Sequence, residues 1–424
     1  GSSRFSPDSR WGLFPSFSAG WRISEEEFMK DIDWLSNLKL RASWGKLGNN
    51  SIGNYEWQAL YGSGYNYAFN SNKSNGLAMT TFSNYALEWE ETSITNIGLD
   101  FGVLNNRLNG TIEVYDKKTD GILYRPTLPE SLNQFTSPLQ NLAGVNNKGL
   151  EITLGWNDRV GDISYSVSGN FTYNKNKVTK YKGELVREWR TDANGNKVWY
   201  QNVGTVANGS SNLIVEGHEM NEYYMMNPYK GNGSYFNSDG TVNINGGPKD
   251  GMIRTEADMK WLQAMFDAGY KFYPNQAIGK DKIWYGDMIY ADYNGDGIYG
   301  NDDDRDFQGV SWRPKYYFGL QASMTWKGFD LSMNWAGAAG FKIDYYKQTQ
   351  NSVSVTHGYG LGYDIAYDHY FFDPENPNDP RTNIYSETPR LVGYQNSGQA
   401  SATSSWHLKN GNYIKLKNLT IGYT

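Results

Sequence analysis

The densest group of possible metal ligands in the sequence lies between residues 292 and 304. It opens with Asp-Tyr-Asn-Gly-Asp-Gly-Ile and closes on three consecutive aspartates. Oxygen donors at the first, third and fifth positions, with glycine at the sixth, match the start of a calcium-binding loop. The carbonyl group at position seven and a carboxylate near position twelve would complete the ligand set. The spacing therefore predicts a structural Ca²⁺ site formed by Asp292, Asn294, Asp296, Ile298, Asp303 and Asp304.

This motif departs from helix–loop–helix calcium sites at its end and on its flanks. Their closing ligand is a bidentate Glu, whereas this sequence offers Asp303 and Asp304, whose side chains are shorter. The flanking residues have the pattern of strands and loops, not of two helices. A second interpretation stays open, namely an acidic Asn/Gly turn that binds no metal.

Other reactive residue types do not form a catalytic group. The histidines, His218, His357, His369 and His407, lack metal-ligand spacing. Carboxylates such as Glu25 to Glu27 are consecutive and do not form the opposed pair that glycoside hydrolysis requires. There is no cysteine, which excludes disulfides, thiolate metal sites and cysteine nucleophiles. We therefore expect that the protein is not an enzyme and that it has no cofactor other than Ca²⁺.

Two long segments, 179–314 and 343–411, contain tyrosine-rich stretches, and aromatic residues make up 16% of the whole chain. Exposed aromatic rings can stack on sugar rings or on peptide side chains, but they also pack long loops against one another. Both interpretations stay open. Within the first segment we predict one helix, over 256–268, with Thr255 as its cap and Gly269 at its end. The predicted ligand or partner contacts are Tyr223, Tyr224, Tyr235, Tyr359, Tyr363 and Tyr370.

The elements that position these loops are strands in which apolar and polar residues alternate. In 97–103, for example, Ile97, Leu99 and Phe101 alternate with small or polar residues, and Leu331 and Met333 do so in 329–335. Since successive side chains of a strand point to opposite faces, each strand has one apolar and one polar face. About nine such strands are expected. Three short turns, at Asn105-Asn106, Asp158 to Gly161 and Lys327-Gly328, alternate with four long loops, 46–88, 124–147, 179–314 and 343–411.

Short turns at one end of a sheet and long loops at the other are typical of outer-membrane β-barrels. The fold class predicted is thus all-β, a transmembrane antiparallel barrel with long extracellular loops. Trp21, Trp156 and Trp326 fall just before turns, as an aromatic belt at the membrane boundary would require, although tryptophan in a sandwich core would also fit. No segment approaches the ~20 apolar residues of a spanning helix. The net charge of −6 without a basic cluster argues against nucleic acid as a partner.

Several segments together resemble the SusC/RagA family of TonB-dependent outer-membrane transporters. The matching segments are RWGLFPS at 10–16, AGWRISEE at 19–26, SNLKLRASWG at 36–45, LEWE at 87–90, TNIGLD at 95–100, NKGLE at 147–151 and YIKLKNLTIGY at 413–423. The segment from Asp287 to Arg305 resembles the family's acidic GDxxYxDxNGDG stretch, but Gly300 replaces an acidic residue and Arg305 comes one residue late.

This resemblance implies a fold and a function beyond what the residues indicate. It implies a 22-stranded barrel with an N-terminal plug, in the outer membrane of a Gram-negative, Bacteroidota-like bacterium. It implies import of oligosaccharides or peptides beneath a SusD-like lipoprotein lid, driven by the TonB complex. The chain would be the later part of this barrel (1–424), with the plug and the TonB-contacting region before Gly1. In that setting the aromatic loops would contact substrate or lid, and the apolar strand faces would contact lipid.

Two other classes of protein remain as alternatives. The first is a secreted all-β glycan-binding protein or glycoside hydrolase in which a structural Ca²⁺ ion stabilises a loop. The second is a surface adhesin that uses a barrel only as its anchor. The environment of Ile97, Leu99, Phe101, Leu331 and Met333 separates a barrel from a secreted domain, because a secreted domain would bury them in a dry core.

Overall fold

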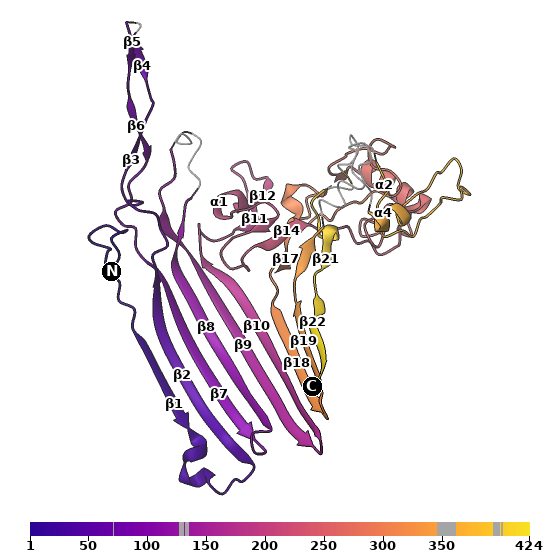
Figure 1. The fold of residues 1–424 in the computed structure, drawn as a ribbon. Coiled ribbons are helices and arrows are strands. Elements are labelled where there is room, and N and C mark those ends of the chain that lie inside the picture. Colours follow the sequence, from indigo (N-terminus) through magenta and orange to yellow (C-terminus); the bar gives the residue numbers. More distant parts are fainter. Residues whose placement is uncertain (71, 127–130, 132–134, 346–361, 393–398, 400–401) are drawn as a thin grey trace.

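A long antiparallel sheet forms the body of the molecule (Figure 1). The computed structural model describes every residue except 71, 127–130, 132–134, 346–361, 393–398 and 400–401. The sheet has nine strands within the described residues, each paired with the next long strand of the chain, and its edges are β1 and β22. The strands are β1 (Ser16–Arg22), β2 (Leu35–Asn49), β7 (Glu90–Val103), β8 (Leu108–Tyr124), β9 (Gln140–Val160), β10 (Ile163–Lys180), β18 (Tyr316–Trp326), β19 (Phe329–Ala339) and β22 (Tyr413–Tyr423). The nine predicted strands are thus confirmed.

One face of this sheet is apolar. Residues directly opposite each other in an antiparallel pair share a face, and the register aligns one apolar row through Leu40, Leu99, Ile112, Ile152, Phe171 and Phe318. Ile97 is 50% exposed, and Leu99, Phe101, Leu331 and Met333 are all partly exposed. None of these five side chains lies in a dry interior, so the structure contradicts the core of a secreted domain. Among the described residues, no helix is long and apolar enough to cross a membrane.

The other face is polar. Across β2, β7 and β8 it carries ion pairs: Arg41 lies 3.2 Å from the Asp100 carboxylate and 2.6 Å from that of Glu113. Arg41 reaches Glu113 by passing over Gly98, where a Cβ atom would lie 2.6 Å from the guanidinium carbon. Across β10, β18, β19 and β22 the same face carries uncharged hydroxyl and amide groups, including Ser166, Ser168, Gln321, Ser323, Ser332, Asn334, Asn418 and Thr420.

The turn end of the sheet agrees with the predicted turns except after β9. Asn105 and Asn106 have φ angles of 58° and 61°, a left-handed conformation that asparagine tolerates. The turn after β9 lies at 161–162 and not at Asp158 to Gly161, because the strand pairing continues to Val160. The link between β1 and β2 holds two 3₁₀ helices, η1 (Ile23–Glu25) and η2 (Glu27–Met29). No side chain caps either of these helices.

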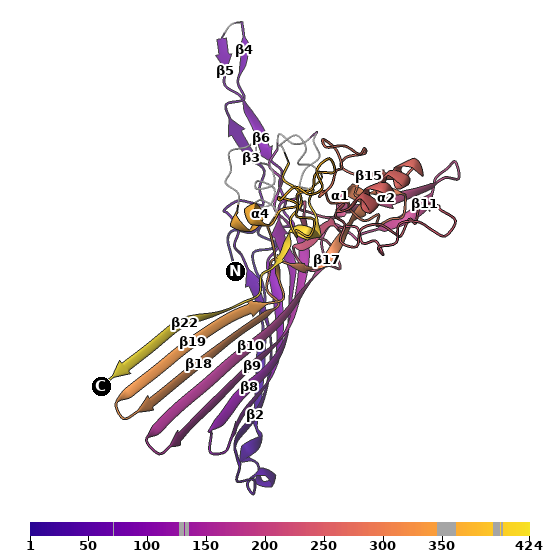
Figure 2. The same cartoon turned by 90° about the vertical axis from the view of Figure 1, so that its right-hand side faces the viewer.

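The loop end holds the other elements and the buried hydrophobic clusters (Figures 1 and 2). The elements are β3 (Leu60–Ser63), β4 (Tyr67–Phe69), β5 (Asn72–Ser74), β6 (Leu77–Thr81), β11 (Arg187–Thr191), β12 (Lys197–Gln201), α1 (Val203–Val206), β13 (Asn212–Leu213), β14 (Glu222–Met226), α2 (Glu256–Asp267), β15 (Lys271–Phe272), β16 (Ile298–Tyr299), η4 (Asp302–Asp304), β17 (Arg305–Ser311), β20 (Lys342–Asp344), α4 (Tyr363–Tyr367), η6 (Ser405–His407) and β21 (Leu408–Asn410).

Two loop predictions have clear outcomes. The helix predicted over 256–268 is confirmed as α2, with Thr255 and Asp258 forming a reciprocal capping box and Gly269 at φ +95°. The loop predicted over 124–147 is wrong at its end, because β9 begins at Gln140. Ala143 and Val145 are buried, so this part of β9 lacks the alternation that marks a strand with one wet face.

Candidate binding cleft between the two long loops

The two longest connections, 181–315 and 340–412, fold together into one body. We call their described residues the loop lobe. Its core contains Trp261 and Met265 of α2, Phe272 of β15 and Tyr290, all from the first connection, and Tyr370 from the second. The indole N–H of Trp261 donates to the Asn243 carbonyl at 2.8 Å. The second connection is thus anchored in a core that the first one builds.

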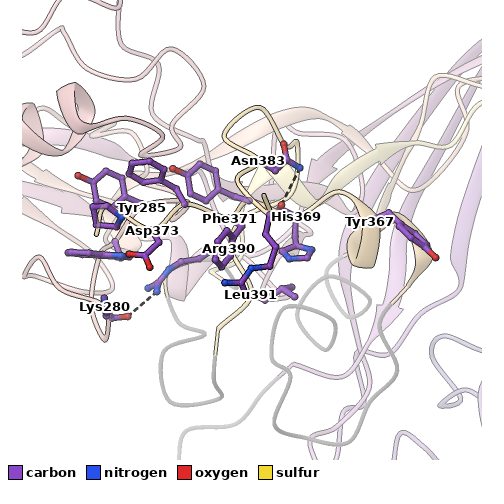
Figure 3. A pocket seen from close by; sticks show the side chains of 14 residues that line it. Lys280, Tyr285, Tyr367, His369, Phe371, Asp373, Asn383, Arg390 and Leu391 are labelled. Atoms are coloured by element: carbon purple, nitrogen blue, oxygen red, sulfur yellow. Dashed lines mark hydrogen bonds between the residues drawn. The ribbon is translucent and has the colours of Figure 1, made fainter. Parts of the chain in front are cut away.

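An open cleft of about 620 Å³ lies where the two connections meet (Figure 3). Aromatic rings dominate its lining, and basic and amide side chains lie between them. The lining residues are Lys280, Trp284, Tyr285, Tyr367, His369, Tyr370, Phe371, Phe372, Asp373, Pro374, Arg381, Asn383, Arg390 and Leu391. Clefts that combine apolar rings with a few fixed polar groups are the usual form of small-ligand sites.

A buried ion pair fixes one wall of the cleft. The Arg390 guanidinium donates to both carboxylate oxygens of Asp287, at 2.9 and 2.8 Å, and Asp287 is fully buried. Asp287 also accepts the Trp284 backbone N–H at 2.8 Å. Arg390 donates in addition to the carbonyl groups of Lys280 and Lys282. Burial raises the pKa of the Asp287 carboxyl, and the Arg390 guanidinium opposes that rise.

A second arginine lies at the solvent edge of the cleft. The Arg381 guanidinium stacks over the Phe371 ring at 4.4 Å and donates to both carboxylate oxygens of Asp379. Phe371 is held in place by paired backbone hydrogen bonds with Asn383. The Asn383 amide donates to the Asp368 carboxylate and to the His369 carbonyl, both at 3.3 Å.

The lining offers ring faces next to hydrogen-bonding groups. Trp284, Phe371 and Phe372 are half-buried, and Tyr367 is 80% exposed and points away from the other rings (Figure 3). Ring faces can contact the C–H face of a sugar or an apolar peptide side chain. Guanidinium and amide groups can bind hydroxyl or carbonyl groups beside them. The cleft can therefore hold an extended, partly polar ligand, and the described residues around it contain no nucleophile–base pair.

The predicted tyrosines are divided between the interior and the surface of the lobe. Tyr223, Tyr224 and Tyr370 are buried, and their hydroxyl groups donate to Lys342, Gln201 and Arg254 respectively. These three rings pack the loops, and of the three only Tyr370 lines the cleft. Tyr235 is half-buried and donates to Asp258. Tyr363 is 82% exposed and stacks on Tyr367, whereas Tyr359 lies outside the described residues. Ligand or lid contact by these tyrosines stays a prediction.

Most of the cleft residues were missed by the sequence prediction. Trp284, Tyr285 and Arg390 belong to no recognised motif, and Phe371 and Phe372 were noted only as part of an aromatic-rich segment. The one available signal was the run Tyr370-Phe371-Phe372, since three adjacent rings in a loop cannot all point into one core.

The acidic loop lies apart from the cleft, and its oxygens accept hydrogen bonds from its own backbone. Asp292 accepts the N–H groups of Gly295, Asp296 and Gly297, and Asp296 accepts that of Ile298. Asn294 accepts from the backbone of Asp296. Asp303 accepts from the Gln201 amide. In the part of the chain that the structure describes, no three His, Asp or Glu side chains are placed to hold a metal ion. The predicted ligands do not converge in this arrangement, and Ca²⁺ binding stays a prediction.

Asp304 is the most deeply buried carboxylate of this loop. It accepts the backbone N–H groups of Tyr293, Gly300 and Asn301 at 2.7 to 3.2 Å. Burial raises the pKa of its carboxyl to about 7 despite these donors. Asp304 therefore has a structural role in closing the loop.

Comparison with known proteins places this architecture in a family. A family model described as TonB dependent receptor-like, beta-barrel matches residues 1–246. The TonB-dependent receptor SusC of Bacteroides thetaiotaomicron is 28% identical over the whole chain, which covers 35% of that protein. The TonB-dependent receptor P39 of Formosa agariphila is 35% identical over 56% of the chain and 24% of its own length. The chain thus spans about a third of the length of the relatives that it matches throughout.

Solved structures agree on the fold. The RagAB peptide transporter superposes on 99% of this chain with a TM-score of 0.67 and 22% identity, covering 38% of the RagAB chain. The related proteins are receptors and transporters, not hydrolases, which agrees with the expectation of a protein that is not an enzyme. The chain belongs to the family of TonB-dependent receptor-like β-barrels, which are proteins of the bacterial outer membrane.

Proposed function

We propose that this chain is part of a transporter that imports oligosaccharides or peptides across the outer membrane. In this proposal the loop lobe captures the substrate, the polar face of the sheet lines the path, and the apolar face contacts lipid. The observation that carries the proposal is the aromatic cleft at the loop end of a sheet whose two faces are sorted by polarity.

The polar face supports passage of a hydrated ligand. Serine, asparagine and glutamine on β10, β18, β19 and β22 offer hydrogen bonds without a strong charge. Such groups replace part of a solute's hydration shell, so a polyhydroxylated or amide-rich ligand is not penalised for entering. A sheet that only anchored an adhesin would have no need of a cleft above a polar wall.

The partners of the proposal follow the relatives. Energy would come from the TonB complex through a region outside this chain, as the names of the relatives indicate. A SusD-like lipoprotein would cover the loop lobe and close over the bound substrate. Both substrate classes are retained, because rings and amides recognise sugars and peptides alike, and RagAB is described as a peptide transporter.

The test is uptake by the whole transporter in its own outer membrane. A strain lacking the gene is grown on single oligosaccharides or peptides as the only carbon source, next to a strain that carries the full-length gene. We expect loss of growth on one class of nutrient and its recovery with the full-length gene. Unchanged uptake of every candidate nutrient would contradict import and favour an adhesin.

The acidic loop supports a smaller proposal, that Ca²⁺ acts as a structural clip in the lobe. Asp292, Asn294 and Asp296 lie in one tight turn, and a cation would have to replace the backbone N–H groups that now donate to their side-chain oxygens. Calorimetric titration of the full-length protein with Ca²⁺ tests this proposal. The heat of binding is compared with that of the variant Asp292→Asn/Asp296→Asn. Equal heats for the two proteins would exclude a site in this loop.

A further inference from the structure

A hairpin projects from the loop end and lies apart from the loop lobe. It comprises residues 60–81 in the connection between β2 and β7, and we call it the arm. β3 pairs with β6 at its base and β4 pairs with β5 near its tip. Figures 1 and 2 both show the arm extending along the strand direction, beyond the ends of the other loops. It therefore points away from the apolar band of the sheet.

The arm has the composition of a recognition loop. Thirteen of the sixteen residues from 61 to 76 are Tyr, Ser, Gly or Asn, and Lys73 is the only Asp, Glu, Lys, Arg or His among them. Antibody-binding loops use this mixture because tyrosine gives a large, rigid contact area and the small polar residues give adaptable hydrogen bonds. The cores of protein interfaces are likewise enriched in aromatic residues and depleted of charge.

The arm exposes large side chains both at its base and near its tip. At the base, Tyr61 pairs with Met79 and Ser63 pairs with Leu77, and these four residues share one face of the hairpin. Nearer the tip, the rings of Tyr67 and Phe69 contact each other with centroids 4.9 Å apart. The exposed fractions are 68% for Tyr61 and Tyr67, 64% for Phe69 and 73% for Leu77. We call these four residues the arm face.

The arm has little to hold it in its extended shape. No residue from 60 to 80 belongs to a buried hydrophobic cluster of the described chain. A two-stranded hairpin by itself is only marginally stable in water. An exposed apolar face on such a hairpin implies that the arm is ordered by what it contacts.

We propose that the arm face docks onto the surface lipoprotein that covers the loop end. This inference rests on the proposed function, which supplies that partner. The arm extends beyond the other loops at this end of the sheet, so a protein that covers the loop end would meet it. The tilted contact between Tyr67 and Phe69, at 57°, does not form the flat platform that a sugar ring would need. The absence of a basic cluster in the arm sequence also argues against a lipid surface.

The test is co-purification of the lipoprotein with the tagged full-length transporter from native membranes. The variant Tyr61→Ser/Tyr67→Ser/Phe69→Ser removes three rings of the arm face. The variant Lys73→Ser is the matched control, because Lys73 pairs with Ala68 on the opposite face of the same hairpin. We expect the triple variant to recover about tenfold less lipoprotein, since aromatic anchors dominate interface affinity. Lys73→Ser should recover as much as the wild type.

Each other outcome has a definite meaning. The proposal is overturned if the triple variant and a variant lacking residues 62–79 both recover as much lipoprotein as the wild type. Heat-dependent gel mobility measures whether each variant is folded. If the triple variant loses both the folded transporter and the lipoprotein, the arm packs on its own protein, and the proposal is overturned as well. Lost binding of a labelled oligosaccharide with the partner retained assigns the arm to substrate instead. A wild-type transporter that recovers no lipoprotein contradicts the proposed function itself.

Discussion

At the scale of single residues, burial decides what each charged group in the loop lobe contributes. Arg390 and Arg381 make the same bidentate contact with an aspartate, and both line the cleft. Arg390 meets a carboxylate with no exposed surface, whereas the Arg381 side chain is 71% exposed, although its partner Asp379 is mostly covered. Water therefore screens the charge of Arg381 far more than that of the Asp287 pair.

The first prediction uses this contrast. Arg390→Ala leaves Asp287 buried without its counter-charge, which we expect to cost the lobe about 3–5 kcal/mol of stability. Hydrogen exchange of residues 283–290 in the full-length protein measures the loss. Arg381→Ala is the control and should leave that exchange unchanged. Equal effects of the two substitutions would show that burial of the Asp287 pair has no energetic role.

The second prediction concerns His407, which is buried in η6. Desolvation lowers the pKa of its imidazole from 6.5 to about 4. In the unfolded segment the imidazole takes up a proton below about pH 6.5, whereas in the folded segment it does so only near pH 4. The contribution of neutral His407 to the free energy of unfolding is therefore complete above pH 6.5 and falls as the pH drops towards 4. The local loss between about pH 7.5 and pH 5 should be about 2 kcal/mol. Exchange of residues 404–410, corrected for intrinsic rates, measures it. His407→Gln should remove most of this pH dependence.

The limits of sequence prediction are also visible at this scale. Tyr223 and Tyr363 have the same residue type in similar loops, yet one is buried and the other is 82% exposed. A loop has no fixed period, so nothing in the sequence indicates which ring faces the core. The buried pair of Asp287 and Arg390 joins residues about a hundred positions apart, which only the folded lobe brings together.

At the scale of elements, sequence prediction succeeded wherever periodicity was present. The sheet strands alternate because one face meets apolar surroundings and the other water, and that pattern gave all nine of them. It failed at 140–147, where Ala143, Gly144 and Val145 of β9 are all buried and apolar and polar residues do not alternate. Helix α2 was predictable because its signals, the Thr255 cap and Gly269, are local.

The third prediction tests the two faces of β7 with adjacent residues. Ile97 is on the apolar face and Asn96 on the polar face. Arginine on the lipid face of a barrel strand costs about 2–4 kcal/mol near the bilayer midplane. We therefore expect Ile97→Arg to reduce the folded, heat-modifiable fraction in the outer membrane, whereas Asn96→Arg leaves it near the wild-type level. The reverse order would place lipid on the opposite face.

At the scale of the whole molecule, the nine-stranded sheet of the described residues has two open edges. Its edge strands β1 and β22 expose unpaired backbone groups, which lipid does not tolerate. The relatives are about three times as long as this chain. The loop lobe, by contrast, has its own buried core. The proposed import function assigns capture to the loop lobe and passage to the sheet, so substitutions in the two parts should have different effects.

The final prediction separates these two steps by the kinetics of uptake. Trp284→Ala/Phe371→Ala removes two ring faces from the cleft without touching the sheet. We expect the substrate concentration for half-maximal uptake to rise about tenfold with little change in the maximal rate, since each ring contributes about 0.5–1.5 kcal/mol of contact. Ser323→Leu/Ser332→Leu, a paired change on the polar face, should instead lower the maximal rate and leave the half-maximal concentration unchanged. Uptake of whichever nutrient the deletion strain fails to use supplies the measurement. If both variants alter the same parameter, capture by the lobe and passage along the sheet are not separate steps, and the division of labour proposed for the molecule is wrong.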